Sequence, residues 1–492
     1  MKKQVVVIGA GFAGLSASCY LARAGYSVTL LEKNNQTGGR ARRYSAEGFT
    51  FDMGPSWYWM PDVFDAFFND FGKKTSDYYT LKRLDPSYRV VFEGGETLDV
   101  PADWEGMKAL FESIEPGSAV HLEKFMAEAE YKYAVGMQDL VHKPGLSITE
   151  YMDWRVVSGL FKLHLIQSFD QYVRTYFTNP KLLQLLEFPV LFLGARPQEI
   201  PALYSLMNYA DIKLGTWYPV GGMHEIVKAM TSLATELGVQ IVLNEPVRKI
   251  RTQQGLAVGV ETASNIYPAD VVVGGADYHH VEQHLLDEAD RQYTPAYWNK
   301  RVMAPSSMLF YIGLSKPIGN LLHHNLFFDA DFNQHAHDIY TEPAWPKHPL
   351  FYASVTTKTE ALGAPAGGEN LFILIPTAPG LADTPALCEQ YYNMVMARLE
   401  AYTGESIRSQ VVYRRDFAHN AFVSEYNAFK GNAYGLANTL WQTAVLKPRM
   451  HSKKIKNLFY TGQLTVPGPG VPPSLISGKV VAEQIKKRYS NN

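Results

Sequence analysis

The chain of 492 residues is poor in cysteine, in excess charge of either sign and in long apolar runs. Its two cysteines, Cys19 and Cys388, exclude a disulfide framework and fit a reducing compartment such as the cytoplasm. The net charge of -2 provides no basic excess for nucleic acid. No stretch supplies the ~20 helix-compatible apolar residues that a membrane-spanning helix requires. We therefore expect neither a nucleic-acid partner nor a transmembrane helix.

Motifs for metal binding or nucleophilic catalysis are also missing. The sequence contains no metal-ligand spacing, no nucleophile elbow and no HExxH. The pairs His279-His280 and His323-His324 are adjacent in sequence, so their side chains point in different directions on a strand or a helix. We expect no metal site, and the sequence identifies no catalytic side chain.

The residues that are present describe a folded enzyme-sized protein. Hydrophobic residues make up 46% of the chain and charged residues 19%, which is below the roughly 25% charge usual for soluble domains. Some apolar surface therefore has a functional use. The length predicts two or three domains.

The N-terminal segment has the pattern of a dinucleotide-binding unit. Val5 to Ile8 is typical of a buried strand, and Gly9, Gly11 and Gly14 then form GxGxxG before a helix and a second strand that ends at Glu32. In such a unit the helix N-terminus binds the pyrophosphate and the acid accepts hydrogen bonds from the ribose. The predicted contacts are Gly9, Ala10, Gly11, Phe12, Ala13, Gly14 and Glu32.

A second glycine pair follows closely. Gly38, Gly39 and Arg40 suit a ligand longer than a nicotinamide dinucleotide, with Arg40 near its phosphates. The alternative is a solvated surface cation beside Arg42 and Arg43.

The C-terminal segment from Asn457 to Gly478 carries no formal charge, and it contains four prolines. Those prolines exclude a spanning helix. Asn457 to Thr461 reads as a short strand, and Pro472-Pro473 fits the first turn of a helix that continues to Arg488.

Together these segments resemble the flavoprotein amine oxidase superfamily and, within it, the bacterial phytoene desaturase branch. The resemblance rests on "GAGFAGL", "LLEKNNQTGGRARR", "GFTFDMGP", "ADVVVGGADYHHVEQ" and "NLFYTGQLTVPGPGVPPSLISGK", and it covers essentially the whole chain. It implies FAD as the cofactor. The further FAD contacts that it implies are Gly39, Arg40, Gly54, Pro55, Ser56, Val247 through its backbone, Gly462, Gln463, Val471 and Pro472. The family more often has an acid or a small residue near Gln463.

The resemblance also implies an α/β fold. A Rossmann-type, glutathione-reductase-like FAD-binding domain would comprise residues 1–75, 205–285 and 450–492. A mixed-sheet substrate domain, 76–110 and 286–449, would be inserted into it, with a helical lid or membrane-facing region at 111–204. Within that lid, Leu182 to Ala195 carries a single charge and is either membrane-facing or a buried helix. Phe64, Phe67, Phe68 and Phe71 share one helical face, which is either core or the wall of a substrate tunnel.

The implied function is FAD-dependent carotenoid desaturation, with phytoene as the favoured substrate. The protein would introduce double bonds into a hydrophobic C40 polyene by hydride transfer to the flavin followed by proton loss, with oxygen or a quinone as electron acceptor. It would be cytoplasmic and attached peripherally to the inner face of the cell membrane. The alternatives are a desaturase of a later hydroxylated or cyclised carotenoid, an FAD amine oxidase, and a non-enzymatic prenyl-lipid escort protein.

Overall fold

The computed structural model describes residues 2–147, 150, 167–191, 193–439 and 441–489. The parts of the expected lid at 148–149, 151–166 and 192 therefore lie outside the described residues.

A five-stranded parallel sheet forms one half of the molecule. Its order is β19-β13-β1-β2-β9, and every neighbouring pair is parallel. The strands are β1 (Gln4–Ile8), β2 (Ser27–Leu31), β9 (Gln240–Val242), β13 (Val271–Gly274) and β19 (Leu458–Tyr460). Segments from both ends and the middle of the chain thus pair in one sheet, and the predicted Rossmann-type arrangement is confirmed.

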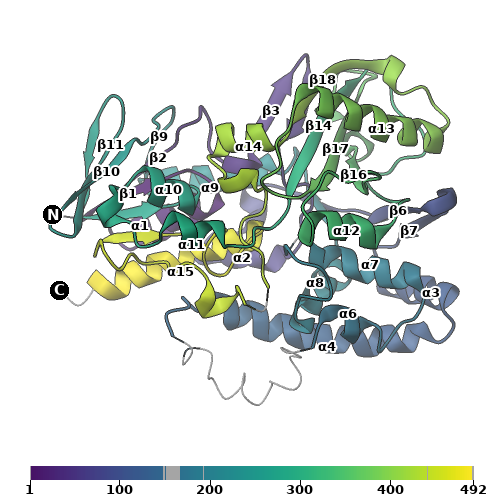
Figure 1. Ribbon diagram of the computed structural model, residues 1–492, viewed down its shortest axis with the longest axis horizontal. Coiled ribbons are helices and arrows are strands. Elements are labelled where there is room, and N and C mark those ends of the chain that lie inside the picture. The colour runs from purple at the N-terminus through teal and green to yellow at the C-terminus, as the bar shows by residue number, and fades with distance from the viewer. Residues whose placement is uncertain (1, 148–149, 151–166, 192, 440, 490–492) are drawn as a thin grey trace.

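Both faces of this sheet are covered, as the β-branched run in β1 predicts. Val5 and Val7 face the helices α1 (Phe12–Arg23), α9 (His224–Glu236) and α15 (Val471–Tyr489). Val6 and Ile8 face α10 (Tyr278–His284) and the three-stranded sheet of β10 (Lys249–Gln253), β11 (Leu256–Glu261) and β12 (Ile266–Pro268). Figure 1 shows α15 running back beneath the parallel sheet toward the N-terminus.

A seven-stranded mixed sheet forms the other half (Figure 1). Its order is β18-β14-β17-β16-β15-β6-β7, and only the pair of β15 and β6 is parallel. The strands are β6 (Tyr88–Phe92), β7 (Thr97–Val100), β14 (Ser306–Leu314), β15 (His324–Phe328), β16 (Phe351–Ser354), β17 (Glu369–Thr377) and β18 (Val411–Phe417). One face packs against α13 (Pro385–Thr403), and the other, with Leu309, Tyr311 and Leu374, faces the interior of the molecule.

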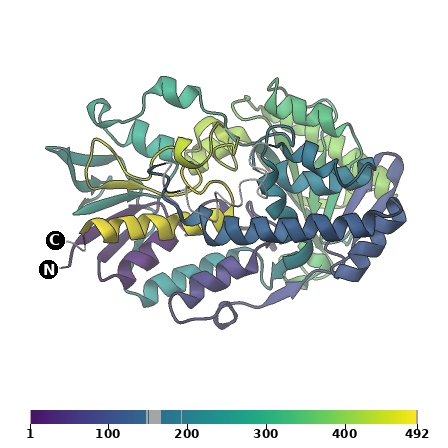
Figure 2. The same ribbon diagram turned by 90° about the horizontal axis from the view of Figure 1, so that it is seen from below.

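A layer of helices lies beside β6 and β7 (Figures 1 and 2). It contains α3 (Trp104–Ile114), α4 (Ser118–Gln138), α6 (Phe169–Val173), α7 (Pro180–Leu191) and α8 (Leu206–Asn208). The residues of α7 from Leu182 to Val190 are buried except Gln184, which favours a buried helix over a membrane-facing one. Among the helices of the described residues, none is long and apolar enough to cross a membrane.

The remaining elements connect the two halves. They are β3 (Arg43–Ala46), β4 (Phe49–Asp52), β5 (Leu81–Arg83), β8 (Trp217–Pro219), α2 (Pro61–Asn69), α11 (Pro295–Asn299), α12 (Phe332–Tyr340) and α14 (His419–Tyr426). The phenylalanine stripe lies on α2 and just after it. Phe67 and Phe68 are core residues, and of the stripe only Phe64 also lines the large cavity described below.

The contact between α1 and α15 depends on a glycine. A Cβ atom on Gly478 would lie 2.5 Å from Ser16 Cβ and 2.6 Å from the Ala13 carbonyl oxygen. We therefore expect Gly478→Val to lower the free energy of unfolding by about 1–3 kcal/mol, because overpacking forces the two helices apart. Urea denaturation measures the change. Glu483→Val, on an exposed position of the same helix, is the control, and equal stability of the two variants would contradict the prediction.

Candidate cofactor and substrate site

One cavity of about 680 Å³ reaches from the carboxyl ends of β1 and β2 to the inner face of the seven-stranded sheet. We call it the main cavity. Its first half is lined by the β1–α1 turn, the Gly38–Ala41 turn and the start of α15. Its second half is lined by aromatic and aliphatic side chains of α7, α12, β15, β16 and β17. The carboxyl edge of a parallel sheet is where ligands bind in open α/β folds.

The three glycines of the β1–α1 turn have separate roles. Gly9 has a φ of 95°, which favours glycine. A Cβ atom on Gly14 would lie 1.9 Å from the Gly9 carbonyl oxygen, so this glycine permits the close packing of α1 on the turn. A Cβ atom on Gly11 would meet no atom of the described residues within 4 Å, because Gly11 borders the main cavity. A ligand can therefore approach the backbone closely at Gly11.

Glu32 stands at the end of β2 with only 4% of its surface exposed. Its Oε2 accepts a hydrogen bond from the Ala10 N–H at 2.8 Å, and its Oε1 accepts from the Asn34 N–H at 2.9 Å. These contacts hold the carboxylate at the cavity wall. Val247 lines the same end of the cavity beside Glu245 and Pro246.

Arg40 is a cation held inside the molecule. Its Nη2 donates to the Asn432 carbonyl oxygen at 3.1 Å, and its guanidinium lies 5.4 Å from the centre of the Tyr426 ring. Its Nε is buried without a hydrogen-bond partner among the described residues. Burial lowers the pKa of Arg40, and the charge of Asp277 opposes that shift. Arg40 lines the main cavity and forms no direct ion pair among the described residues, so a phosphate group there would supply an anion within bonding distance.

Gln463 lies next to Arg40. When its amide is oriented to satisfy both ends, the oxygen accepts from Arg40 Nη2 at 3.0 Å and the nitrogen donates to the Tyr434 carbonyl oxygen at 3.3 Å. An amide in place of an acid leaves the positive charge of Arg40 available to a ligand.

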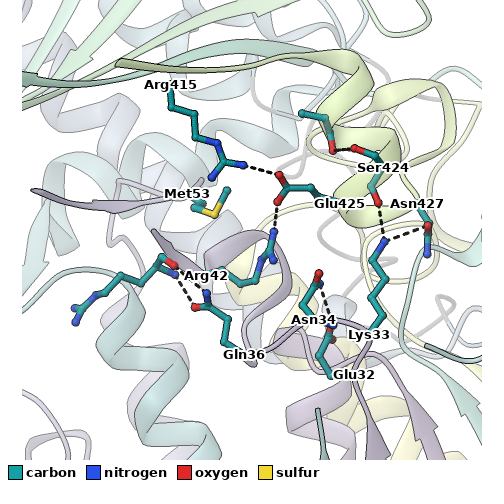
Figure 3. A network of polar contacts seen from close by, with 12 residues as sticks. Glu32, Lys33, Asn34, Gln36, Arg42, Met53, Arg415, Ser424, Glu425 and Asn427 are labelled. Carbon is teal, nitrogen blue, oxygen red and sulfur yellow. Dashed lines mark hydrogen bonds and ion pairs between the residues drawn. The ribbon is translucent and has the colours of Figure 1, made fainter. Parts of the chain in front are cut away.

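A polar network borders this half of the main cavity (Figure 3). Glu425 of α14 forms ion pairs with Arg42 and with Arg415, the latter at 2.6 Å. Lys33 Nζ donates to the Ser424 carbonyl oxygen at 2.8 Å and to Asn427 Oδ1 at 3.3 Å. Arg42 is only 6% exposed, so it is no solvated surface cation. The network ties the end of β2 to α14, which comes from the far half of the sequence.

Most polar side chains in the second half of the main cavity are engaged by the protein. Ser307, whose Oγ lies beside the Tyr434 hydroxyl, has no partner at hydrogen-bonding geometry among the described residues. His335 Nε2 lies 2.9 Å from the Pro376 carbonyl oxygen, and its Nδ1 accepts from the Leu350 N–H at 3.0 Å. Burial lowers the pKa of His335 to about 4, so the ring is neutral. The Tyr340 hydroxyl donates to the Leu191 carbonyl oxygen, and the Tyr352 hydroxyl lies 2.6 Å from His324 Nδ1. The chamber therefore suits a hydrocarbon ligand.

The family is decided by comparison with known proteins. Residues 12–486 match the family described as flavin containing amine oxidoreductase. The chain belongs to this family. Within it, the chain is 42% identical over 485 residues to a carotenoid 3,4-desaturase of Haloarcula japonica, covering 98% of each protein. It is 31% identical over 491 residues to a zeta-carotene-forming phytoene desaturase of Myxococcus xanthus, covering 98% of this chain and 94% of the relative.

A solved structure supports the fold of this flavin-containing oxidoreductase. An oxidoreductase from Methanosarcina mazei matches 98% of this chain and 100% of its own with a TM-score of 0.60 and 17% identity. At that identity the likeness concerns the fold alone, and it agrees with the parallel sheet and the inserted mixed sheet.

Most of the residues that the sequence predicts as cofactor contacts meet in one place. The main cavity is lined by Gly9, Gly11, Phe12, Ala13, Glu32, Gly39, Arg40, Gly54, Pro55, Ser56, Val247, Gly462, Gln463, Val471 and Pro472. Ala10 and Gly14 do not line it: Ala10 positions Glu32, and Gly14 packs α1 on the turn. The residues that border the cavity fit a flavin dinucleotide, and their contact with it remains a prediction.

Sequence reasoning missed several lining residues. Asn34 follows Glu32 by two positions, and its place after the second strand could have revealed it. Glu425, Tyr426 and Asn427 lie almost 400 positions further along the chain and carry no motif. Asp277 and His280 are contributed by the start of α10.

The glycine roles predict different outcomes for two substitutions. Gly14→Ala should lower the melting temperature, because its Cβ atom would collide with the Gly9 carbonyl oxygen. Gly11→Ala should leave the melting temperature of the flavin-free protein within about 2 °C but weaken flavin binding, because its methyl group would occupy the space for the phosphates. Thermal unfolding and flavin fluorescence titration measure the two effects. Unchanged flavin affinity in Gly11→Ala would contradict this account.

A buried lysine behind the C-terminal loop predicts a pH effect on stability. Lys447 is 4% exposed, its Nζ donates to Asn438 Oδ1 at 2.6 Å, and burial lowers its pKa to about 7. The folded state therefore binds fewer protons than the unfolded state between about pH 7 and pH 10, so this lysine makes stability rise with pH in that range.

Replacing the lysine should remove this dependence. The difference in free energy of unfolding between wild type and Lys447→Met should shift in favour of wild type by up to about 1.4 kcal/mol per pH unit above pH 7. Urea denaturation at several pH values measures it, with the exposed Lys453→Met as control. Parallel pH profiles for wild type and Lys447→Met would be the contrary result.

Proposed function

We propose that this protein is an FAD-dependent carotenoid desaturase. The observation that carries the proposal is the main cavity itself. Its dinucleotide cradle opens directly into an apolar chamber whose histidine and tyrosines are bonded within the protein. The relatives named carotenoid 3,4-desaturase and phytoene desaturase, each covered almost end to end, support the same activity.

The binding mode of FAD follows from the lining residues. Gly11 and the N–H groups that begin α1 would bind the pyrophosphate, with Arg40 as counter-charge. Glu32 would accept the adenosine ribose hydroxyls, and the backbone at Val247 would contact the adenine. Gly462 and Gln463 would lie by the ribityl chain, with Gly54, Pro55, Ser56, Val471 and Pro472 by the isoalloxazine ring.

The protein contributes a fixed substrate position and a water-free chamber to the reaction. When bound, FAD supplies a two-electron acceptor for the hydride that leaves one carbon of the substrate, and the neighbouring carbon then loses a proton. The apolar chamber excludes water from the polyene. His335 holds the β17 and Leu350 backbones together through both ring nitrogens, so it is a positioning residue rather than a base.

The names of the two relatives describe different desaturation reactions. The chain is 42% identical to the 3,4-desaturase and 31% identical to the phytoene desaturase. This difference favours a later, hydroxylated or cyclised carotenoid over phytoene as the substrate. Phytoene remains the second candidate because the 31% relative also matches almost the whole chain.

We further propose the domain division and a membrane contact. The FAD-binding domain comprises 1–75, 205–285 and 450–492, the substrate domain 76–110 and 286–449, and the described parts of 111–204 form a helical region.

The protein attaches peripherally to the cytoplasmic face of the membrane, where its substrate resides. Trp441 is 85% exposed, and Leu446 and Leu146 are also exposed. Leu446 and Leu146 lie on two segments that approach each other at Ala444 and Gly145, and these apolar side chains are the proposed membrane contact.

The test combines cofactor identification with turnover. We expect the purified protein to release FAD on heating, identified by chromatography. With a quinone or oxygen as acceptor, it should convert lycopene or phytoene in liposomes to products whose absorption is shifted to longer wavelength.

Each alternative predicts a different outcome. An amine oxidase would oxidise amines and leave the carotenoids unchanged. An escort protein would bind prenyl groups without needing flavin. Flavin-loaded protein that desaturates no carotenoid with either acceptor would refute the proposal.

A further inference from the structure

Two adjacent histidines are buried behind the wall of the main cavity. His324 begins β15 and is 0% exposed, and His323 precedes it and is 5% exposed. The His324 ring stacks on Trp57, which lines the main cavity, with ring centres 4.1 Å apart. Burial lowers the pKa of His324 well below its ordinary value and the pKa of His323 to about 3. Both rings are therefore neutral near pH 7, and each keeps one basic nitrogen.

The hydroxyl group of Tyr352 connects His324 to the main cavity. Tyr352 of β16 lines the cavity, and its hydroxyl lies 2.6 Å from His324 Nδ1. When the ring hydrogen of His324 is on Nε2, the hydroxyl donates to Nδ1. Burial raises the pKa of Tyr352, so the hydroxyl keeps its proton. A tyrosine of the chamber wall is thus hydrogen-bonded to a nitrogen that can take up its proton.

Two other polar side chains of the chamber have weaker acceptors as partners. The Tyr340 hydroxyl donates to the Leu191 carbonyl oxygen at 2.8 Å, and a backbone carbonyl is too weak a base to take the proton. His335 contacts the backbone through both ring nitrogens, at Pro376 and at Leu350. These contacts orient the two side chains but offer no acceptor for a proton from the cavity.

The Tyr352 hydroxyl lies where the chamber meets the cofactor half of the main cavity. It is beside the hydroxyl groups of Ser56 and Ser354. Ser56 lines the main cavity and follows Gly54 and Pro55, which we place by the isoalloxazine ring. A carotenoid carbon that reacts beside that ring therefore comes close to the Tyr352 hydroxyl.

From His324 a row of polar groups leads to the surface. The rings of His324 and His323 have their centres 4.4 Å apart, and the Nε2 atom of each is buried without a hydrogen-bond partner among the described residues. His323 Nδ1 lies 2.6 Å from Thr359 Oγ1. Thr359 is partly exposed, and its carbonyl oxygen accepts from the exposed Lys82 at 3.2 Å. Rotation of one ring would bring the two Nε2 atoms together and complete a path for a proton.

We propose that Tyr352, backed by His324, accepts the proton that the carotenoid loses. This inference rests on the proposed function and identifies the base of its second step. Tyr352 is then a catalytic residue, and His324 acts through it.

The proton transfer balances as follows from the contacts. After the hydride has left one carbon, the C–H bond of the neighbouring carbon breaks, and its electron pair forms the new double bond. The proton bonds to the Tyr352 oxygen while the tyrosine's own proton moves to His324 Nδ1. The imidazolium formed at His324 lies on the face of the Trp57 ring, which stabilises a cation. A C–H bond beside a carbocation is strongly acidic, so a weakly basic imidazole is sufficient.

The experiment measures flavin reduction in a single turnover without oxygen. It uses flavin-loaded protein with lycopene or phytoene in liposomes, whichever wild type desaturates. Tyr352→Phe removes the hydroxyl alone, and His324→Asn offers the hydroxyl an amide oxygen that takes up no proton. Each variant should slow flavin reduction by about 10²-fold, as expected for loss of a general base. The Kd of the carotenoid, from equilibrium titration, should not change.

Deuterium in the substrate distinguishes loss of the base from general damage to the site. The carotenoid carries deuterium on each of the two reacting carbons in turn. In wild type we expect the larger isotope effect from the carbon that loses the hydride. In Tyr352→Phe and His324→Asn proton loss becomes the slow step, so the isotope effect from the other carbon should rise.

Tyr391→Phe is the matched control. The Tyr391 hydroxyl is also buried and donates to the Pro346 carbonyl oxygen at 2.6 Å, but Tyr391 does not line the main cavity. This variant should match wild type in rate and in both isotope effects. Melting temperatures check that every variant is folded.

Nitrogen NMR of histidine-labelled protein provides a readout without turnover. The Nδ1 signal of His324 should shift in Tyr352→Phe and stay in place in Tyr391→Phe, because only the first change removes its hydrogen bond. An Nδ1 signal that is the same in wild type and Tyr352→Phe would count against the pair.

The outcomes separate this inference from the proposed function. An active wild type with an equally active Tyr352→Phe would overturn the inference and leave the function intact. Slower variants that keep the wild-type isotope effects would do the same, because they would show damage to the hydride step. If wild type desaturates neither carotenoid, the proposed function is wrong and the inference fails with it.

Discussion

The first turn of α1 has to fit between two backbones that leave no room for a side chain. On one side the Gly9 carbonyl oxygen approaches Gly14, and on the other α15 approaches Ala13 and Ser16 through Gly478. Ser16 Oγ also donates to the Leu475 carbonyl oxygen at 2.7 Å. This double close approach brings the N-terminus of α1 and the N-terminus of α15 to the same cavity, although they are some 460 residues apart. The cofactor half of the site depends on it.

From this fixed point the site is built by long-range polar contacts. Arg42 follows the glycine pair and pairs with Glu425 of α14, while Lys33 binds the end of the same helix. The helix thereby covers the end of β2, and Tyr426 comes to lie beside the Arg40 guanidinium. Because Arg40 is partly enclosed and its Nε is unpaired, the site holds positive charge where a phosphate fits. The network therefore joins the two halves of the fold and also determines where positive charge is available to a ligand.

The sequence predicts the parts of this site that are local. The glycine turn, Glu32 and the helix that begins near Pro472 all follow from backbone requirements that act over a few residues. The sequence does not predict the pairing of Arg42 with Glu425, because ion pairs between distant segments leave no local pattern. It also does not predict the second cavity, of about 300 Å³, since its lining depends on which face of β16 and β17 turns inward. Tyr218 shows the same limit: it appears as one aromatic among several near two glycines, and only the folded chain places it in one cavity with Ser354.

The lack of a catalytic motif in the sequence has a structural counterpart. His335, Tyr340 and Tyr352 line the chamber, but the polar group of each forms a hydrogen bond within the protein. A water molecule in such a chamber finds few partners, and an amine would lose its hydration without gaining a counter-ion. A polyene loses nothing by entering. The chamber thus selects its ligand by the scarcity of free polar groups among its described residues. The residues of the chamber contribute shape and dryness, and the electron-accepting chemistry is left to the cofactor.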